Sequence, residues 1–344
     1  MDRTYKLRFS EREWVKPVFG VMIIFVMCVV FSPSNTKGDL VFLKFENLTN
    51  ILRQVSENGI ISVGMTYVII AGGIDLSVGS VLALSATITA FGLMDWQLGF
   101  LPTMALALAV SSVAGFFNGA ITSWGKIQSF IVTLAMMTAA RGFALLISNN
   151  NSRDIGFGPG GAPSIFAVFS TSYWGVPFPV FIFIATTVLF LFVLKKTKFG
   201  RYVYALGSNE EAAVLAGLRV KWIRTYTFIL AGALSGLAGI IHAGQLMQGN
   251  PNDGVGFELD AIAAVVIGGT SLMGGKGTLE GTFAGVLIIG LLSNILGLHG
   301  IQKDFQLMLK GAIIVAAVFL QESGPGLLPL RSLIRSWDPR KRHR

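Results

Sequence analysis

The sequence predicts an all-α, polytopic membrane protein with about ten transmembrane helices, two glycine-rich interruptions and both termini in the cytoplasm. Of the 344 residues, 53% are hydrophobic and 13% are charged, whereas soluble proteins carry about 25% charged residues. The apolar residues form runs close to the length of a bilayer span. The basic residues gather in blocks beside these runs, as they do in cytoplasmic loops.

The same distribution of charge argues against a nucleic-acid-binding protein, although the net charge is +9. The single cysteine, Cys28, lies inside the first apolar run, so we expect neither a disulfide framework nor a zinc cluster. The three histidines, His242, His299 and His343, are too far apart in sequence for metal-ligand spacing. No set of acidic, basic or nucleophilic residues converges on one depth of the predicted bundle. We therefore expect no metal site, no catalytic residues and no enzyme activity.

The chain divides into three parts. A basic arm over residues 1–16 and a basic tail over residues 323–344 should both lie in the cytoplasm. The membrane domain, residues 17–322, contains two long polar loops. The loop rich in Asn, Ser, Gly and Pro, residues 148–176, is expected outside, and the loop rich in Lys and Arg, residues 195–224, inside.

The first span should cover Val18 to Phe31 and stay uncleaved, because no small-x-small cleavage site follows it. Next, Phe45–Glu57 has an amphipathic pattern, and Arg53 and Glu57 should pair on one helical face at the membrane entrance. Within the last span, Lys310 should face the bundle or a neighbour, since a charge facing lipid is costly. The other spans are expected over about 58–71, 76–93, 102–122, 128–147, 177–194, 225–245, 259–268, 278–298 and 305–320.

The stretch Gly64–Ser80, GMTYVIIAGGIDLSVGS, places a glycine pair and one acidic residue between two apolar runs. Because glycine lacks a Cβ, the helix can break at Gly72 and Gly73. The carboxylate of Asp75 beside this break is costly unless it faces protein, water or a solute. We interpret the stretch as a hinge or gate in a transport path. The alternative is a tight cytoplasmic turn in which Asp75 caps the next helix.

A second glycine-rich break, GGTSLMGGKG, covers Gly268–Gly277. It imitates a phosphate-binding loop but fails twice, because Thr270 occupies the first glycine position and Gly277 follows Lys276 where Ser or Thr should bind magnesium. Interrupted apolar segments in both halves of a chain are frequent in transport proteins. The shared pattern therefore suggests that both glycine-rich breaks are elements of a transport path.

Inside the loop 195–224, residues 208–218 are expected to form a short helix on the cytoplasmic face. It should start at Ser208 or Asn209, with Glu210 and Glu211 in its first turn and Gly217 near its end. The density of Ala and Gly along it favours a docking surface for a partner protein. The alternative is an ordinary solvated loop helix.

At GMTYVIIAGGIDLSVGSVLAL the sequence resembles the membrane permeases of bacterial sugar ABC importers, the ribose, xylose and galactoside type. The likeness continues through FENLTNILRQVSEN, TKFGRYVYALGSNEEAAVLAGLRV and FELDAIAAVVIGGTSLMGGKGT. It covers residues 45–320 in consistent order, and the combination of motifs is far more specific than any one of them.

The resemblance implies a multi-pass permease in the bacterial inner membrane, surrounded by lipid and paired with a second copy or a sister permease. A separate ATPase subunit using ATP and Mg would bind inside, a periplasmic sugar-binding protein would bind outside, and this chain would hold no cofactor. The family's ATPase-coupling segment matches Gly200, Arg201, Ala205, Gly207, Asn209, Ala212, Ala213 and Gly217. Its glycine elements, assigned to the translocation path or gate, match Gly72, Gly73, Asp75, Ser77, Gly79, Gly268, Gly269, Thr270, Gly274, Gly275 and Lys276.

The mechanism that the resemblance implies is alternating access, in which a ribose-like monosaccharide moves inward as ATP closes the partner ATPases and the 208–218 helix transmits the motion. A path with few charges suits a neutral sugar, and we expect weak contacts from Ser77, Asn118 and Thr133. The alternative is an ion-coupled secondary transporter that uses Asp75 as its coupling carboxylate.

Overall fold

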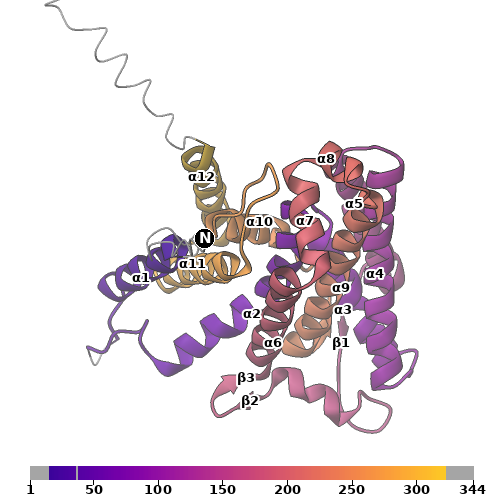
Figure 1. Ribbon diagram of the computed structural model, residues 1–344. Helices are drawn as coiled ribbons and strands as arrows, with labels where there is room; N and C mark the ends of the chain where they lie inside the picture. The colour runs from indigo at the N-terminus through magenta and orange to yellow at the C-terminus, as the bar shows by residue number, and fades with distance from the viewer. Residues whose placement is uncertain (1–14, 36–37, 323–344) are drawn as a thin grey trace, which may run out of the picture.

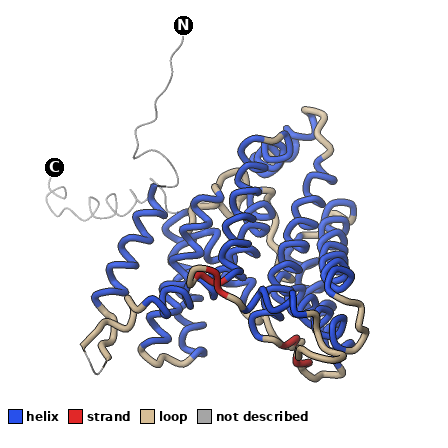
Figure 2. The backbone as a smooth tube through the Cα atoms, turned by 90° about the horizontal axis from the view of Figure 1, so that it is seen from below, coloured by secondary structure: helices blue, strands red, loops and turns tan. Residues whose placement is uncertain are grey.

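The computed structural model describes residues 15–35 and 38–322. Within these ranges the chain forms twelve α-helices and one 3₁₀ helix (Figure 1). The predicted tail, residues 323–344, and nearly all of the predicted arm, residues 1–16, lie outside the described residues. Figure 2 shows how little of the chain is strand.

The secondary structure follows the predicted order with few exceptions. The α-helices are α1 (Val15–Val30), α2 (Phe45–Ile70), α3 (Val78–Met94), α4 (Phe100–Trp124), α5 (Ser129–Ser148), α6 (Phe178–Lys196), α7 (Lys198–Ser208), α8 (Glu210–Leu215), α9 (Val220–Leu246), α10 (Phe257–Ile267), α11 (Leu279–Leu298) and α12 (Lys303–Glu322). The other elements are the 3₁₀ helix η2 (Ser164–Ser170) and the strands β1 (Arg153–Asp154), β2 (Ser172–Tyr173), β3 (Val176–Pro177) and β4 (Gln248–Gly249). Antiparallel pairs form between β1 and β4 and between β2 and β3. The helical class is confirmed, and the strands are an addition that the all-α prediction did not include.

Five of the described helices, α4, α5, α6, α9 and α11, are long and apolar enough to cross a membrane. Large apolar side chains are exposed over much of the bundle, as a surface covered by lipid requires. Examples are Phe19, Val30, Leu101, Phe143, Leu146, Val188 and Phe192. The protein is a polytopic helical membrane protein, as the composition predicts.

Helix α9 lies at the centre of one group of helices and contacts α2, α3 and α4 through small residues. A Cβ added to Gly64 of α2 would lie 2.8 Å from the Cα atom of Ala231. On α4, the small-xxx-small pair Gly115 and Gly119 lies against the α9 backbone, and a Cβ on Gly119 would lie 2.5 Å from the Cα atom of Thr225. Close approach of the backbones therefore holds this group together. This is common in membranes, because lipid tails are as apolar as the helices and the hydrophobic effect does not drive the helices to associate.

Helix α2 joins this group to a second one. On one side it packs against α9 and α6, and on the other against α10 and α11, with α1 on α11 and α12 on α10 (Figure 1). Two hydrogen bonds mark the two sides. Thr66 Oγ1 lies 2.8 Å from Thr282 Oγ1 of α11, and Tyr67 Oη donates a bond of 2.6 Å to the carbonyl of Phe190 on α6.

The bundle has two distinct ends. The four strands and η2 lie toward the bottom of Figure 1, at what we call the strand end. Helices α7 and α8 lie at the opposite end, which we call the α7–α8 end (Figure 1).

Two predicted boundaries differ from the structure. The amphipathic stretch from Phe45 does not form a separate entrance helix but continues without a break into α2. Helix α9 begins at Val220, within the loop predicted over residues 195–224. The short helix expected over residues 208–218 is α8, with Asn209 as its N-cap and Gly217 just beyond its end, whereas the preceding helix α7 (Lys198–Ser208) was not predicted.

The expected pair of Arg53 and Glu57 is not what the structure shows. Glu57 is buried on α2, and its Oε2 atom lies 2.7 Å from Nδ1 of His242 on α9. Arg53 is exposed. A buried carboxylate needs a polar partner inside the bundle, and the tertiary partner on α9 supplies it.

Helix α10 has 11 residues and is therefore about 16 Å long, roughly half the thickness of a hydrocarbon core. An irregular segment, residues 250–256, leads into it from β4. Gly249 lies against Ala86 and Ala90 of α3, whereas Gly254 lies against Gly79 in the first turn of the same helix. The segment thus runs along α3 before α10 begins.

The packing of α4 on α9 predicts opposite effects for two glycine-to-alanine changes. Gly119→Ala should lower the free energy of unfolding by about 1–3 kcal/mol, because the helices must separate to admit the Cβ. Gly142→Ala on α5 is the matched control, since nothing lies within 4 Å of its added Cβ; it should raise stability by up to about 1 kcal/mol through helix propensity. Thermal unfolding of the purified protein in detergent measures both, and equal effects would contradict the packing.

Candidate functional site

Both glycine-rich breaks meet the end of α7 at one point, which we call the glycine junction and define as Gly72, Gly207, Gly274 and Gly275. The backbone N–H of Gly275 donates a hydrogen bond of 2.9 Å to the carbonyl of Ile70. A Cβ on Gly207 would lie 2.6 Å from the nitrogen of Gly275 and would overlap the Ile70 carbonyl oxygen. One on Gly274 would lie 3.1 Å from the Cα atom of Gly72. Three backbone segments touch directly here, so a movement of α7 acts on both breaks.

Further contacts fix α7 in this position. Tyr204 Oη donates a hydrogen bond of 2.6 Å to the carbonyl of Gly277 in the second break. At the other end of α7, the N-cap Thr197 accepts a bond from the N–H of Gly200, which is buried against the carbonyl of Leu194. Helix α7 is therefore attached to the second break at one end and to α6 at the other.

The predicted coupling residues all lie on α7, on α8 or in the turns beside them. Gly200 and Ala213 are buried, and Gly207 is partly buried in the glycine junction. The exposed ones are Arg201, Ala205, Asn209, Ala212 and Gly217. The segment therefore has one face in contact with the bundle and one free face.

Local sequence explains how α8 is held. The side chain of Asn209 accepts a hydrogen bond of 2.9 Å from the N–H of Ala212, which caps the first turn. Gly217, with φ +79°, ends the helix in the left-handed conformation that suits glycine. Glu210 and Arg224 form a two-pronged ion pair at 2.5 and 3.2 Å that ties α8 to α9.

The first break contains a cluster of buried polar side chains around Asp75. Its Oδ1 atom accepts hydrogen bonds from the N–H and the hydroxyl of Ser77, at 2.8 and 2.6 Å. Asn118 of α4 donates 2.9 Å to the Ser77 hydroxyl and lies 3.5 Å from both carboxylate oxygens. Thr133 of α5 accepts from the N–H of Leu76 at 3.1 Å.

The structure thus brings together four residues that were predicted from separate parts of the chain, Asp75, Ser77, Asn118 and Thr133. Each is at most 1% exposed. Their side chains bind one another or the backbone of the break, so they hold the break in shape, with α4 and α5 as the supports. Their part in translocation stays a prediction.

The remaining predicted gate residues occupy close contacts of the two breaks. Gly73 packs against Phe228 of α9, and Gly268 against the backbone of Gly281 on α11. Gly269 adopts φ +92° in the second break, and Thr270 beside it is buried. The sequence assigned these residues to breaks, and Gly73, Gly268, Gly269 and Thr270 do lie in non-helical backbone, whereas the predicted gate residue Gly79 lies in the first turn of α3.

A second polar network binds the irregular segment that leads into α10, residues 250–256, to α5 and α9. His242 lies 3.1 Å from Oδ2 of Asp253 through Nε2, in addition to its contact with Glu57. Arg141 of α5 donates to the backbone carbonyls of Pro251 and of Asp253, the latter at 2.7 Å. Charged groups on α2, α5 and α9 therefore meet at this segment, a convergence that single-sequence patterns did not reveal.

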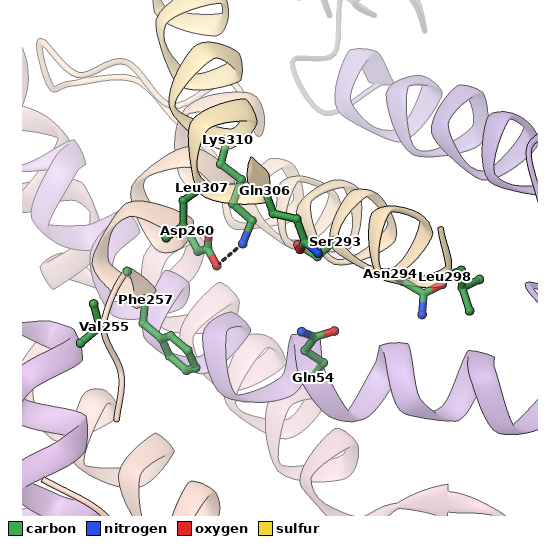
Figure 3. Close-up of a pocket in the computed structure, with 12 residues that line it drawn as sticks. Gln54, Val255, Phe257, Asp260, Ser293, Asn294, Leu298, Gln306, Leu307 and Lys310 are labelled. Carbon is green, nitrogen blue, oxygen red and sulfur yellow. Dashed lines mark hydrogen bonds and ion pairs between the residues drawn. The ribbon is translucent and has the colours of Figure 1, made fainter. Parts of the chain in front are cut away.

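A polar cavity of 490 Å³ opens between α2, α10, α11 and α12 (Figure 3). Lys310 of α12 donates a hydrogen bond of 2.8 Å to Oδ2 of Asp260 on α10, which confirms that Lys310 faces the bundle. The sequence analysis missed this cavity, although the polar pair Ser293 and Asn294 within an apolar run was a usable signal. The polar residues that line it are Gln54, Asp260, Ser293, Asn294, Gln306 and Lys310.

Comparison with known proteins gives a family for this arrangement. The family described as the permease component of branched-chain amino acid transport systems matches residues 47–318. The ribose import permease protein of Haemophilus influenzae is 44% identical over 278 residues, which cover 80% of this chain and 85% of the relative. The chain belongs to this permease family. No solved structure matches it.

Other relatives carry sugar names as well. The ribose import permease protein of Bacillus subtilis is 42% identical over 308 residues, 88% of this chain and 91% of the relative. The D-allose transport system permease protein of Escherichia coli is 35% identical over 296 residues, 86% and 89% of the two chains. The resemblance to sugar permeases is confirmed.

Membership identifies the chain as a multi-pass permease of an importer and as a transport component rather than an enzyme. It favours the importer over the ion-coupled alternative. In the described part of the permease, no group of three or more His, Cys, Asp or Glu residues could hold a metal ion.

The Asp75 cluster predicts different results for two substitutions. Asp75→Ala should destabilise the permease by about 1–3 kcal/mol or more, because the N–H and the hydroxyl of Ser77 lose their acceptor inside the bundle. Asp75→Asn keeps an acceptor oxygen at the same place and should retain both fold and uptake. Thermal unfolding and solute uptake measure this pair. Loss of uptake in a well-folded Asp75→Asn variant would instead support the ion-coupled alternative.

Proposed function

We propose that this permease carries a ribose-like monosaccharide into the bacterial cell as the membrane-spanning subunit of an ABC importer. Relatives from both Haemophilus and Bacillus are ribose import permeases at more than 40% identity, and this observation carries the proposal. The family description names branched-chain amino acids, but the sequence relatives named above all carry sugar names.

The topology that fits best has ten crossings, made by α1 to α6 and α9 to α12, with both termini in the cytoplasm. The Lys and Arg residues on the α7–α8 end support this orientation, because cytoplasmic loops are rich in basic residues. They include Lys195, Lys196, Lys198, Arg201, Arg219, Lys221 and Arg224. The strand end would then face the periplasm, and α10 with its irregular leader would make one crossing together.

The free face of α8 is suited to a separate ATPase subunit. Leu215 is 88% exposed and Val214 lies beside it, while Met273 of the second break is also largely exposed. Exposed apolar side chains on a solvated end of a membrane protein mark a surface that a partner covers. ATP and Mg would be held by that subunit and not by this chain.

The glycine junction gives a route from this surface to the bundle. Closure of the ATPase subunits on ATP would move α7 and α8, and direct backbone contact would pass the movement to the breaks at Gly72 and Gly274. The two breaks, with Asp75 and Thr270 in them, would act as the gate between inward-facing and outward-facing states. Nucleotide drives the change only if it favours one of these states over the other.

Two further partners complete the proposed importer. A periplasmic sugar-binding protein would deliver the sugar at the strand end, so the permease itself need not bind it tightly. A second copy of this chain or a sister permease would sit beside it in the inner membrane. Uptake of labelled ribose by cells that lack their own ribose permease, with the partner subunits supplied, tests the function; uptake of leucine in place of ribose would refute it.

Exposure of Leu215 predicts that ATPase assembly depends on this side chain. Leu215→Asp should cut the amount of co-purified ATPase subunit at least about tenfold, since a buried unpaired charge costs several kcal/mol. Trp174→Asp is the matched control, because Trp174 is 92% exposed but lies in the loop between β2 and β3 at the other end. Quantified co-purification from detergent measures both variants. Equal loss, or loss in neither, would place the ATPase elsewhere.

A further inference from the structure

We propose that the polar cavity between α2, α10, α11 and α12 is the place where the permease holds the hydroxyl groups of the sugar during passage (Figure 3). This inference rests on the proposed function. The volume of the cavity, 490 Å³, lies within the range of about 300–1,000 Å³ that is usual for small-molecule sites. None of the coupling or gate residues predicted from the sequence lines the cavity.

The position of these side chains is the first argument. Ser293 and Asn294 lie on α11, one of the helices long and apolar enough to cross a membrane. They lie in its last six residues, and polar groups on a membrane-spanning helix are costly unless they face protein, water or a solute path. Asn294 is paired with Asn47 of α2 by two hydrogen bonds of 3.1 and 2.8 Å. Ser293 faces the cavity (Figure 3).

Unused hydrogen-bonding capacity is the second argument. Within the described ranges, the side chains of Gln54 and Ser293 make no hydrogen bond to the protein, and both line the cavity. They come from α2 and α11, which lie on two sides of the space. An amide and a hydroxyl offer both donors and acceptors, and a sugar hydroxyl can use either.

The charge of the cavity indicates a neutral ligand. Lys310 and Asp260 are its charged lining residues, and they neutralise each other across 2.8 Å. Neither charge remains to bind a charged substrate. The Lys310 ammonium still has free N–H donors, and the Asp260 carboxylate still has free acceptor sites, for the hydroxyl groups of a sugar. Phe257 and Leu307 add apolar surface for the carbon face of a sugar ring, the usual mixture in small-molecule sites.

The shape of the cavity indicates one end of a closed path. A narrow extension of 30 Å³, room for roughly two water molecules, continues from Gln54 and Ser293 past Asn58 and Ala264. A sugar cannot enter this extension as it stands. Movement of α10 against α11 would widen it, and both helices flank the second glycine-rich break that contacts α7.

Cysteine protection tests the site directly. Gly297 lines the cavity and has nothing within 4 Å of an added Cβ, so Gly297→Cys in a Cys28→Ala background places a thiol there without displacing a proposed sugar contact. A water-soluble methanethiosulfonate reagent should label it in membranes that contain the full transporter. Ribose at twice its dissociation constant or more should slow this labelling at least about threefold, because only the unoccupied fraction of the cavity, 1/(1 + c/Kd) at ribose concentration c, leaves the thiol open to the reagent. Ser172→Cys, exposed on β2, is the control thiol and should be unaffected.

Removal of the proposed contacts should weaken the protection. Gln54→Met and Ser293→Ala should each raise the half-protecting ribose concentration by about 3- to 10-fold. Ser112→Ala on α4 is the matched control, because that hydroxyl bonds to the carbonyl of Leu108 and is not part of the cavity lining. No shift in either cavity variant would overturn the assignment.

The remaining outcomes separate this inference from the proposed function. If wild-type transporter takes up ribose but ribose never protects the Gly297→Cys thiol, the cavity is not the sugar site and the function stands. If that thiol is unreactive or forms a disulfide with a second permease copy, the cavity belongs to an interface and the assignment fails. Uptake of leucine and not ribose would refute the proposed function itself.

Discussion

Around Gly207 three stretches of backbone touch with no side chain between them, and this contact is the constraint on which the permease depends. A side chain on Gly207 would overlap the carbonyl that ends α2 and would crowd Gly275 in the second break. Since these contacts are as close as backbone atoms allow, α7 cannot move alone. The α7–α8 segment and the two glycine-rich breaks therefore behave as one mechanical unit, although about 200 residues of chain separate Gly72 from Gly274.

A second constraint is that polar groups inside this bundle need partners. Asp75 binds Ser77 within its own break, while Glu57 and Asp253 both approach His242 from other elements. The first pair fixes the shape of one break, and the two contacts of His242 hold separate segments together, because an unpaired polar group in an apolar environment is costly. Among the described residues, some buried hydroxyls, such as those of Thr87 and Thr103, lack a partner. The exposed Gln54 and the half-buried Ser293 also make no hydrogen bond to the protein, and both line the polar cavity, where a passing solute would supply a partner.

Much of the fold followed from periodicity and composition, and the two breaks followed from their glycine pairs. The helix beginning at Asn209 and the inward direction of Lys310 were likewise predictable, because capping and the cost of a charge in lipid are local rules. The meeting of Asp75 with Asn118 and the partner of Glu57 could not be derived, since both depend on which helices become neighbours. The cavity could not be derived for the same reason, because its lining comes from four helices that are spread along the chain.

The two proposed functional regions lie in different parts of the bundle, and their separation has a physical reason. The ATPase surface must be solvated and cytoplasmic, whereas a sugar path must lie within the bundle. Helices α10 and α11 link them, because they line the cavity at the ends away from the break and are joined at their other ends by the break that touches Gly207. In the proposed mechanism, a movement of α7 would change the angle between these two helices at their junction and so open or close the narrow extension beside Gln54 and Ser293. The sugar could then be held weakly, because the helices and not its affinity would set its direction of travel.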